Sequence, residues 1–257
     1  MLERRLTLEV TARLEPRNRL LARLPDAVLS KLRPHLKPVS LPRGRALCEV
    51  DEPLRRVYFV ETGAVSLVTV FEDGATAEMA TVGREGVLGV DTLLGGEHAL
   101  GRYVVALSGF ALAVETSRFQ SALREAPELH AACEVYAQAF LANLLQNVAC
   151  NARHTVEQRC ARWLLMCDDQ VEDDSFDLTQ EYLADMLGVR RSTVTLVARA
   201  LQNTDLIRYR RGAITVRDRG GLEAAACECY RIVRDRYEGA LARTGGLMDV
   251  MTLRKAG

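Results

Sequence analysis

The sequence predicts an α+β fold with an N-terminal antiparallel β-roll of the jelly-roll type, then one long helix, then a compact C-terminal part. Three observations support this prediction. Short β-rich runs separated by glycine turns fill residues 39–115, apolar side chains follow a helical spacing over residues 128–151, and two short helices precede a hairpin in residues 178–216. The predicted units are an arm (1–20), the roll (21–125), the long helix (126–153), the C-terminal domain (154–240) and a tail (241–257).

Composition limits the classes of protein to consider. A chain of 257 residues with 48% hydrophobic content buries a substantial core in one or two domains. The 34 basic residues balance the 34 acidic ones, so any nucleic-acid surface must be local. No run of about 18 apolar residues occurs, and the first twenty residues alternate charge with leucine. We therefore expect a cytoplasmic protein without a membrane span or secretory signal.

The β-rich part contains predicted strands at residues 57–60, 65–71, 103–105 and 111–114, each followed or preceded by a glycine turn. Asp73-Gly74 is a strong hairpin signal, because glycine takes a positive φ at low cost. Before the roll we expect a loose arm over residues 2–24 and a short helix over residues 26–36.

The long helix has one apolar stripe along about seven turns. Such a stripe packs either on the chain's own roll or against a second copy. Because it continues beyond the length that a small roll covers, we predict a dimerisation helix. The predicted dimer interface comprises Cys133, Tyr136, Phe140, Leu144 and Val148. A second helix is expected over residues 155–167, followed by an acidic, solvated linker over residues 168–175.

Residues 178–201 have the pattern of a helix-turn-helix. Thr179 is a natural N-cap for the first helix, and Gly188 ends it in the left-handed region. In the second helix Val194, Val197, Ala198 and Leu201 form one inward stripe, which leaves arginine and hydroxyl side chains on the opposite face. Arginine pairs with guanine in a DNA major groove, and serine or threonine contacts bases or phosphates.

A hairpin with a basic tip follows over residues 206–216, which predicts the wing of a winged helix-turn-helix. Between Gly188 and Arg219 there are eight arginines and two aspartates, a local net charge of +6. A basic patch of this kind binds DNA phosphates with an affinity that falls steeply with salt. The alternative is an ordinary helical hairpin with a solvated basic face. The predicted DNA contacts are Thr179, Gln180, Arg190, Arg191, Ser192, Thr193, Thr195, Arg199, Arg208, Arg210 and Arg211.

The order of roll, long helix and winged helix-turn-helix resembles the Crp/Fnr family of bacterial transcription regulators. The resemblance covers residues 18–238 and is most specific over residues 178–216, with a further match between residues 41–63 and the opening of a cyclic-nucleotide-binding roll. It implies a sensor roll, a homodimer on a pseudo-palindromic double-stranded DNA site, a recognition helix in the major groove, and RNA polymerase as a partner.

The sequence departs from the cyclic-AMP-binding members of that family. These members hold ribose and phosphate with a Gly-Glu pair and a downstream Arg-Ser/Thr-Ala. Val87 stands at the glutamate position and Tyr103 follows Arg102, so we expect no dependence on cyclic AMP. If an effector pocket exists, its predicted residues are Gly86, Val87, Leu88, Gly89, Arg102 and Tyr103.

The cofactors of other family members are not expected either. Only Cys48 precedes Cys133, which excludes an N-terminal iron–sulfur cluster. The histidines lack a haem-ligand motif; they are His35, His98, His130 and His154. On a helix Cys227 and Cys229 would point to opposite sides, and no zinc-type spacing is present, so we expect no metal. Buried, reduced thiols are the expectation for all seven cysteines, with a thiol- or peroxide-responsive switch as the alternative.

The reading helix also departs from the family pattern. Ser192 replaces a frequent glutamate and Leu196 a frequent arginine, so the base preference does not carry over. Asp205 replaces a frequent glycine before the wing, and aspartate tolerates the left-handed conformation there.

The sequence therefore predicts a DNA-binding transcription regulator. A redox- or ligand-sensing module that acts through protein contacts is the alternative, and an enzyme is not supported because no catalytic motif is present. The long helix is the expected two-state element between roll and reader.

Overall fold

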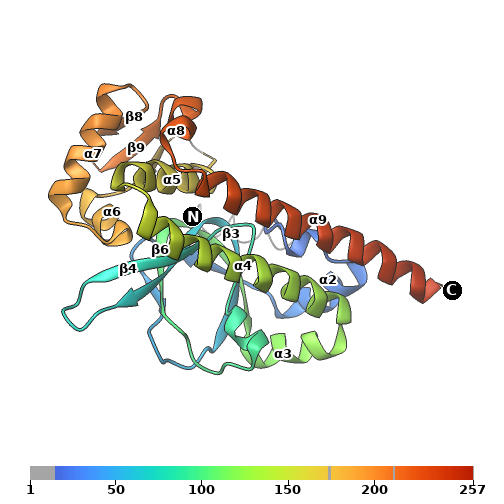
Figure 1. The fold of residues 1–257 in the computed structure, drawn as a ribbon. Helices are drawn as coiled ribbons and strands as arrows, with labels where there is room; N and C mark the ends of the chain where they lie inside the picture. Colours follow the sequence, from blue (N-terminus) through green and yellow to red (C-terminus); the bar gives the residue numbers. More distant parts are fainter. Residues whose placement is uncertain (1–14, 173–174, 211, 257) are drawn as a thin grey trace, which may run out of the picture.

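The computed structural model describes residues 15–172, 175–210 and 212–256. A C-terminal helical unit lies at one end of two long helices, and the N-terminal roll lies alongside these helices (Figure 1). This arrangement confirms the predicted α+β class and the predicted order of parts.

The roll is a six-stranded antiparallel sheet in the order β1-β6-β3-β4, with β2 also on β6 and β5 also on β3. Its strands are β1 (Lys37–Leu41), β2 (Ala46–Cys48), β3 (Arg56–Val70), β4 (Thr76–Val82), β5 (Val87–Leu88) and β6 (Arg102–Glu115). Side chains such as Phe59, Leu112 and Val105 fill its core. Asp73-Gly74 forms the predicted hairpin between β3 and β4, with Gly74 at φ 80°.

Two strands of the roll, β3 and β6, are longer than predicted, because each joins two stretches that were predicted as separate strands. Residues 57–60 and 65–71 were predicted as separate strands around a turn at Gly63, but β3 runs through that position. The pairing of β3 with β6 shifts register there, Gly63 has φ 77°, and a side chain on the facing Gly109 would collide with the Thr62 carbonyl. The glycines thus allow a bulge, which bends a strand without ending it.

The segment before the roll is packed rather than loose over its described residues. Asn18 is buried; its Nδ2 donates to the Val60 and Gly86 carbonyl oxygens and its Oδ1 accepts from the Leu21 amide. The expected arm is therefore wrong from Asn18 onward, and residues 1–14 lie outside the described part. The short elements that follow are η1 (Leu21–Arg23), α2 (Asp26–Leu32) and η2 (Arg33–His35).

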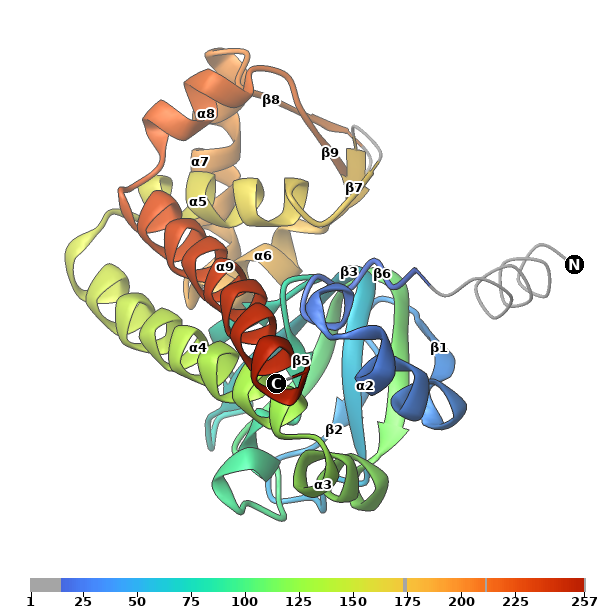
Figure 2. The same cartoon turned by 90° about the vertical axis from the view of Figure 1, so that its right-hand side faces the viewer.

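Two long helices run antiparallel along one face of the roll (Figure 2). After η3 (Val90–Leu94) and α3 (Thr116–Glu125), α4 spans Pro127–Arg153 and α9 spans Cys229–Ala256. Asn143 of α4 donates to the Tyr237 hydroxyl of α9 at 3.3 Å, and the Tyr136 and Tyr237 rings stack at 6.0 Å. The helix α9 continues through residue 240, so the predicted boundary between domain and tail falls inside it.

This packing corrects the predicted dimer interface. Cys133, Tyr136 and Phe140 are buried inside the chain, between the roll and α9, and Leu144 is half-buried. Only Val148, 70% exposed, remains on the surface. The sequence pattern locates an apolar stripe but does not show that a second long helix of the same chain covers it.

The C-terminal unit has a three-stranded sheet in the order β7-β9-β8, and its apolar core continues into side chains of β3 and β6 of the roll. Its elements are α5 (Val156–Asp168), β7 (Ser175–Asp177), α6 (Gln180–Leu187), α7 (Arg191–Asn203), β8 (Ile207–Arg210), β9 (Ala213–Val216) and α8 (Arg219–Ala225). Among the described residues, no helix combines the length and apolarity needed to cross a bilayer.

Candidate nucleic-acid interface

The helices α6 and α7 form the predicted helix-turn-helix. The Thr179 hydroxyl accepts from the Tyr182 amide and caps α6, and Gly188 ends that helix at φ 64°. Val194, Ala198 and Leu201 are buried on the inner side of α7, and Val197 is partly buried. The inward stripe fixes which side of α7 faces the core, so the opposite side is presented to solvent.

The outward face of α7 holds the predicted contact residues of the reader. Arg190, Arg191, Ser192 and Arg199 are exposed, whereas Thr193 and Thr195 are half-buried. The Thr195 hydroxyl donates to Gln180 Oε1 at 2.8 Å and joins the two helices. Gln180 and Thr195 thus position each other at the front of the motif, next to the arginines.

An apolar side chain lies among these polar ones. Leu196 is 66% exposed, whereas Val194, Ala198 and Leu201 of α7 turn inward. An exposed leucine on a reading face offers a surface for the methyl group of thymine rather than a hydrogen bond.

The wing is the hairpin of β8 and β9. Arg208 and Arg210 are exposed on β8, and Gly212 has φ 81° at the tip; Arg211 lies outside the described residues. Asp205 has φ 55°, which confirms that this aspartate adopts the left-handed conformation before the wing. The wing and the outward face of α7 together form the basic surface that the sequence predicts.

Arg219 does not belong to that surface. Its guanidinium pairs with Asp168, with Asp169 at 2.6 Å and with Glu223 at 3.3 Å. Counting it as a phosphate-binding charge was wrong, because carboxylates of α5 and α8 neutralise it. The acidic segment was likewise predicted to have no direct role, yet Asp168 and Asp169 hold α8 in place.

Polar contacts join the reader to the roll. Trp163 of α5 donates from Nε1 to Glu78 Oε2 of β4 at 2.7 Å, and the Thr81 hydroxyl donates to Glu78 Oε1 at 2.8 Å. Burial raises the pKa of Glu78 above its ordinary value, while hydrogen bonds from Ser66, Thr81 and Trp163 oppose that rise. A carboxylate of the roll is thus held directly by the first helix of the C-terminal unit.

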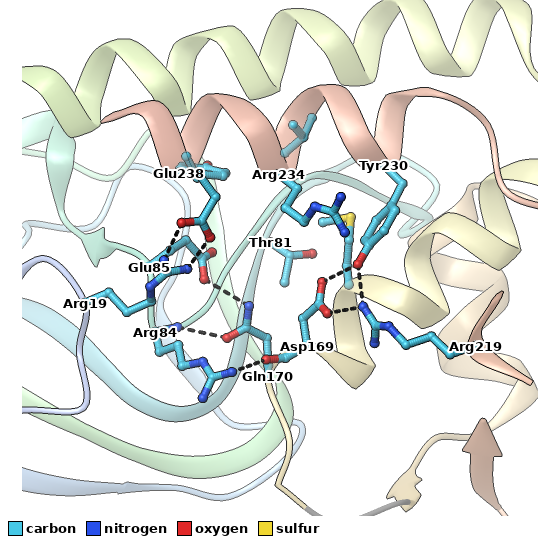
Figure 3. Close-up of a pocket in the computed structure, with 13 residues that line it drawn as sticks. Arg19, Thr81, Arg84, Glu85, Asp169, Gln170, Arg219, Tyr230, Arg234 and Glu238 are labelled. Carbon is cyan, nitrogen blue, oxygen red and sulfur yellow. Dashed lines mark hydrogen bonds and ion pairs between the residues drawn. The ribbon is translucent and has the colours of Figure 1, made fainter. Parts of the chain in front are cut away.

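A second set of contacts surrounds a cavity of about 240 Å³ at the same junction (Figure 3). Gln170, just after α5, accepts from the Arg84 amide at 3.0 Å and donates to Glu85 Oε2 at 2.9 Å. Beside Glu85, Arg19 forms a bidentate ion pair with Glu238 of α9, at 2.7 and 2.6 Å. The roll, α5 and α9 therefore meet through charged and polar side chains here, beside the apolar contacts that also join them.

Four of the predicted effector residues lie in the core of the roll or contact other side chains of the protein. Val87 and Leu88 are core residues of β5, paired with Phe59 and Tyr58. Arg102 faces Glu49 at 3.2 Å. The Tyr103 hydroxyl donates to Asp91 at 2.6 Å, and both side chains are buried.

Asp91 is outside the predicted set. By accepting the hydrogen bond from Tyr103, its carboxylate joins η3 to β6. A cyclic nucleotide needs a free cation for its phosphate and an acceptor for its ribose. Arg102 is already paired with a carboxylate, and Asp91 with a phenol, so these residues do not fit that ligand.

The described histidines and cysteines occupy different environments. His35, His98 and His130 are exposed, which does not suit an axial haem ligand, whereas His154 is only 12% exposed. All seven cysteines are free thiols and buried, as expected. Burial raises the pKa of Cys133 and of Cys160 to about 12. The pKa of Cys150 is lowered instead, mainly by a hydrogen bond from Cys227, with a contribution from the Arg162 charge.

A β-roll joined by a long helix to a winged helix-turn-helix defines a class of protein, the DNA-binding regulators with an N-terminal sensor domain. Residues 38–126 match the family model of the cyclic nucleotide-binding domain, and residues 158–225 match that of the Crp-like helix-turn-helix domain. The chain is 30% identical over 186 residues to the global nitrogen regulator of Synechococcus elongatus, a match that covers 68% of this chain and 82% of the relative. The chain belongs to the Crp/Fnr family of transcription regulators.

Solved structures share the fold. FixK2 from Bradyrhizobium japonicum superposes with a TM-score of 0.64 at 20% identity, over 75% of this chain and 98% of that one. A Crp/Fnr-family transcriptional regulator from Thermus thermophilus gives 0.57 at 24% identity, over 74% and 98% of the two chains.

Proposed function

We propose that this regulator is a homodimer that reads a pseudo-palindromic DNA site independently of cyclic AMP, and that RNA polymerase is its partner. It acts by binding rather than by catalysis. The observation that supports this proposal most directly is the outward face of α7, where Arg190, Arg191 and Ser192 are exposed beside a basic wing. A two-fold pair of such helices spans two half-sites about one helical turn apart.

The proposed dimer surface lies on α4. Leu141, Leu145 and Val148 are 56%, 63% and 70% exposed and follow the i, i+4, i+7 spacing of a helix-pairing seam. No charged residue stands between Glu134 and Arg153 in the sequence. An uncharged helix face with three exposed aliphatic side chains favours burial against a second copy.

The contacts within the roll support independence from cyclic AMP. Val87 is an apolar core residue, Arg102 already has Glu49 as a counter-charge, and Tyr103 is bonded to Asp91. A roll with these contacts lacks the free cation and acceptor that a cyclic nucleotide requires.

Selection of binding sites from a random DNA pool, repeated at two salt concentrations, tests the proposal. We expect a two-fold symmetric sequence to be enriched, and Arg191→Ala to lower affinity for it by about 1–3 kcal/mol with a loss of sequence preference. Arg210→Ala should weaken binding to all sequences alike and reduce the salt dependence by about one phosphate contact. Arg231→Ala, an exposed arginine on α9, is the matched control. Enrichment of no symmetric site, or equal effects of Arg191→Ala on selected and random DNA, would overturn the proposal.

A further inference from the structure

Four side chains with metal-binding atoms meet where α4 ends and α9 begins. Cys150 lies in the last turn of α4, His154 is the residue after that helix, Cys227 precedes α9 and Cys229 is its first residue. One donor atom from each lies within 4.8 Å of every other. The three cysteines are at most 3% exposed.

The distances fit one small ion. In a tetrahedral site with metal–sulfur bonds of about 2.3 Å, neighbouring ligand atoms stand about 3.8 Å apart. Cys150 Sγ and Cys227 Sγ are 3.5 Å apart, and Cys229 Sγ is 3.6 Å from His154 Nδ1. We propose that Cys150, His154, Cys227 and Cys229 form a closed Cys₃His site for one divalent ion of the zinc class.

The surroundings of His154 support this assignment. Its Nε2 is 3.2 Å from Glu228 Oε2, which leaves Nδ1 directed at the cysteines. A carboxylate on the far nitrogen is the usual partner of a metal-bound histidine, because it fixes the tautomer and the ring orientation. Gln146 also donates to Cys229 Sγ at 3.1 Å.

The charge balance is also suitable. Three thiolates and a neutral histidine around a divalent ion leave one negative charge. The buried side chain of Arg162, whose positive charge acts on Cys150, offsets it. Zinc prefers these nitrogen and sulfur donors, and structural zinc sites of this composition have no open position.

Two other interpretations explain less of the arrangement. A disulfide would use Cys150 and Cys227 but leave the convergence of Cys229, His154 and Glu228 unexplained. An iron–sulfur cluster holds its ligands around several iron atoms and therefore needs them farther apart than the 4.8 Å limit of this group. A single ion accounts for all four ligands.

The site has a defined structural consequence. It ties the start of α9 to the end of α4. Thr155, the residue after His154, caps α5 with a capping box, and the DNA-binding unit begins there. A bound ion thus fixes the position at which the DNA-binding unit begins after α4.

Metal analysis of the full-length protein, purified under reducing conditions and passed over a weak chelator, tests the proposal. We expect about one zinc per chain by mass spectrometry. After removal of zinc, titration with Co²⁺ should give the visible bands and the sulfur-to-cobalt charge-transfer absorption of a tetrahedral thiolate site. These measurements use the unaltered protein, so they decide the question even if a variant misfolds.

Variants identify the ligands. Cys150→Ser and Cys229→Ser should lower affinity for zinc by about tenfold or more. Cys229→His, which keeps a donor, should still bind cobalt with an altered spectrum. Cys160→Ser, at a buried cysteine outside the group, should bind like the unaltered protein. The proposal is overturned if the protein neither contains nor takes up metal, or if it contains iron and sulfide instead of zinc. It is also overturned if metal-free protein purified under reducing conditions holds a Cys150–Cys227 disulfide, or if Cys160→Ser loses as much zinc affinity as the ligand variants.

Discussion

At the scale of single residues, Leu196 is one of the two positions, with Ser192, at which the reading helix departs from the family pattern. It stands exposed on α7, where the family pattern often has an arginine. Arginine favours guanine through two hydrogen bonds, whereas leucine contacts the thymine methyl group. A leucine at this position therefore offers a base a different chemistry than arginine does, while the frame of the motif is set by Gly188 and the buried stripe.

Replacing Leu196 tests that role. Leu196→Ala should weaken binding to the selected site by about 1–2 kcal/mol, because apolar area on the base is lost, with little effect on random DNA. Leu196→Arg should move the preference at that base pair from thymine toward guanine. Site selection followed by titration measures both effects, and Leu94→Ala, at an 80% exposed leucine on the roll, is the control. An unchanged preference in Leu196→Arg would show that this side chain does not reach a base.

At the scale of elements, β4 and α5 are joined through Glu78 and Trp163. The carboxylate receives hydrogen bonds from both the roll and the reader, and burial raises its pKa above the ordinary 4.5. A folded-state pKa above the unfolded one means that the folded protein binds this proton more tightly. The contribution of Glu78 to stability is therefore complete below pH 4.5 and is lost as pH rises through the folded-state pKa.

Glu78→Gln removes this titration. We expect the free energy of unfolding of the variant, relative to the unaltered protein, to improve as pH rises above about 4.5 and to be least favourable at the acidic end. Urea unfolding at a series of pH values measures the difference. Glu72→Gln, at an exposed glutamate of the β3–β4 hairpin, controls for general charge effects. A difference that stays constant with pH, or that changes in the opposite direction, would contradict the proposed cause.

The same elements show what sequence reasoning reaches. Local signals were sufficient for the Thr179 cap, the Gly188 stop and the Asp73-Gly74 hairpin, because each depends on the conformation of one or two residues. The bulge at Gly63 was mistaken for a turn, since a glycine with positive φ serves both and only the pairing with β6 distinguishes them. Glu78 gave no signal of its contact with the reader, because its partner there, Trp163, is 85 residues away along the chain.

At the scale of the whole molecule, α9 is the element that the sequence did not place. Its packing along α4 buries part of the predicted dimer stripe and moves Cys229 next to His154. The ligands of the proposed metal site have no zinc-type spacing in the sequence, because Cys227 and Cys229 do not share a helix and their partners lie in another segment. The pair Cys150 and His154, one helical turn apart, was the available signal, but it needed the position of α9 to become a site.

The corrected surface of α4 leads to a prediction about assembly. With Cys133, Tyr136 and Phe140 enclosed, the aliphatic seam open to a second copy is Leu141, Leu145 and Val148. Leu145→Arg places a charge at its centre, and an unpaired charge in an interface costs about 3 kcal/mol or more, which is about 100-fold or more in the dissociation constant. Sedimentation velocity should show a shift from dimer to monomer, with an unchanged circular dichroism spectrum.

The effect on DNA separates this surface from a merely exposed one. A monomeric variant retains α7 and the wing, so it should still bind a single half-site weakly while losing the gain that a two-fold site gives to two linked readers. Leu94→Arg adds the same charge at an exposed leucine of the roll and should leave both assembly and binding unchanged. If Leu145→Arg stays dimeric and keeps its preference for the two-fold site, the readers must be paired through another surface, and α4 then serves only to connect the roll with the DNA-binding unit.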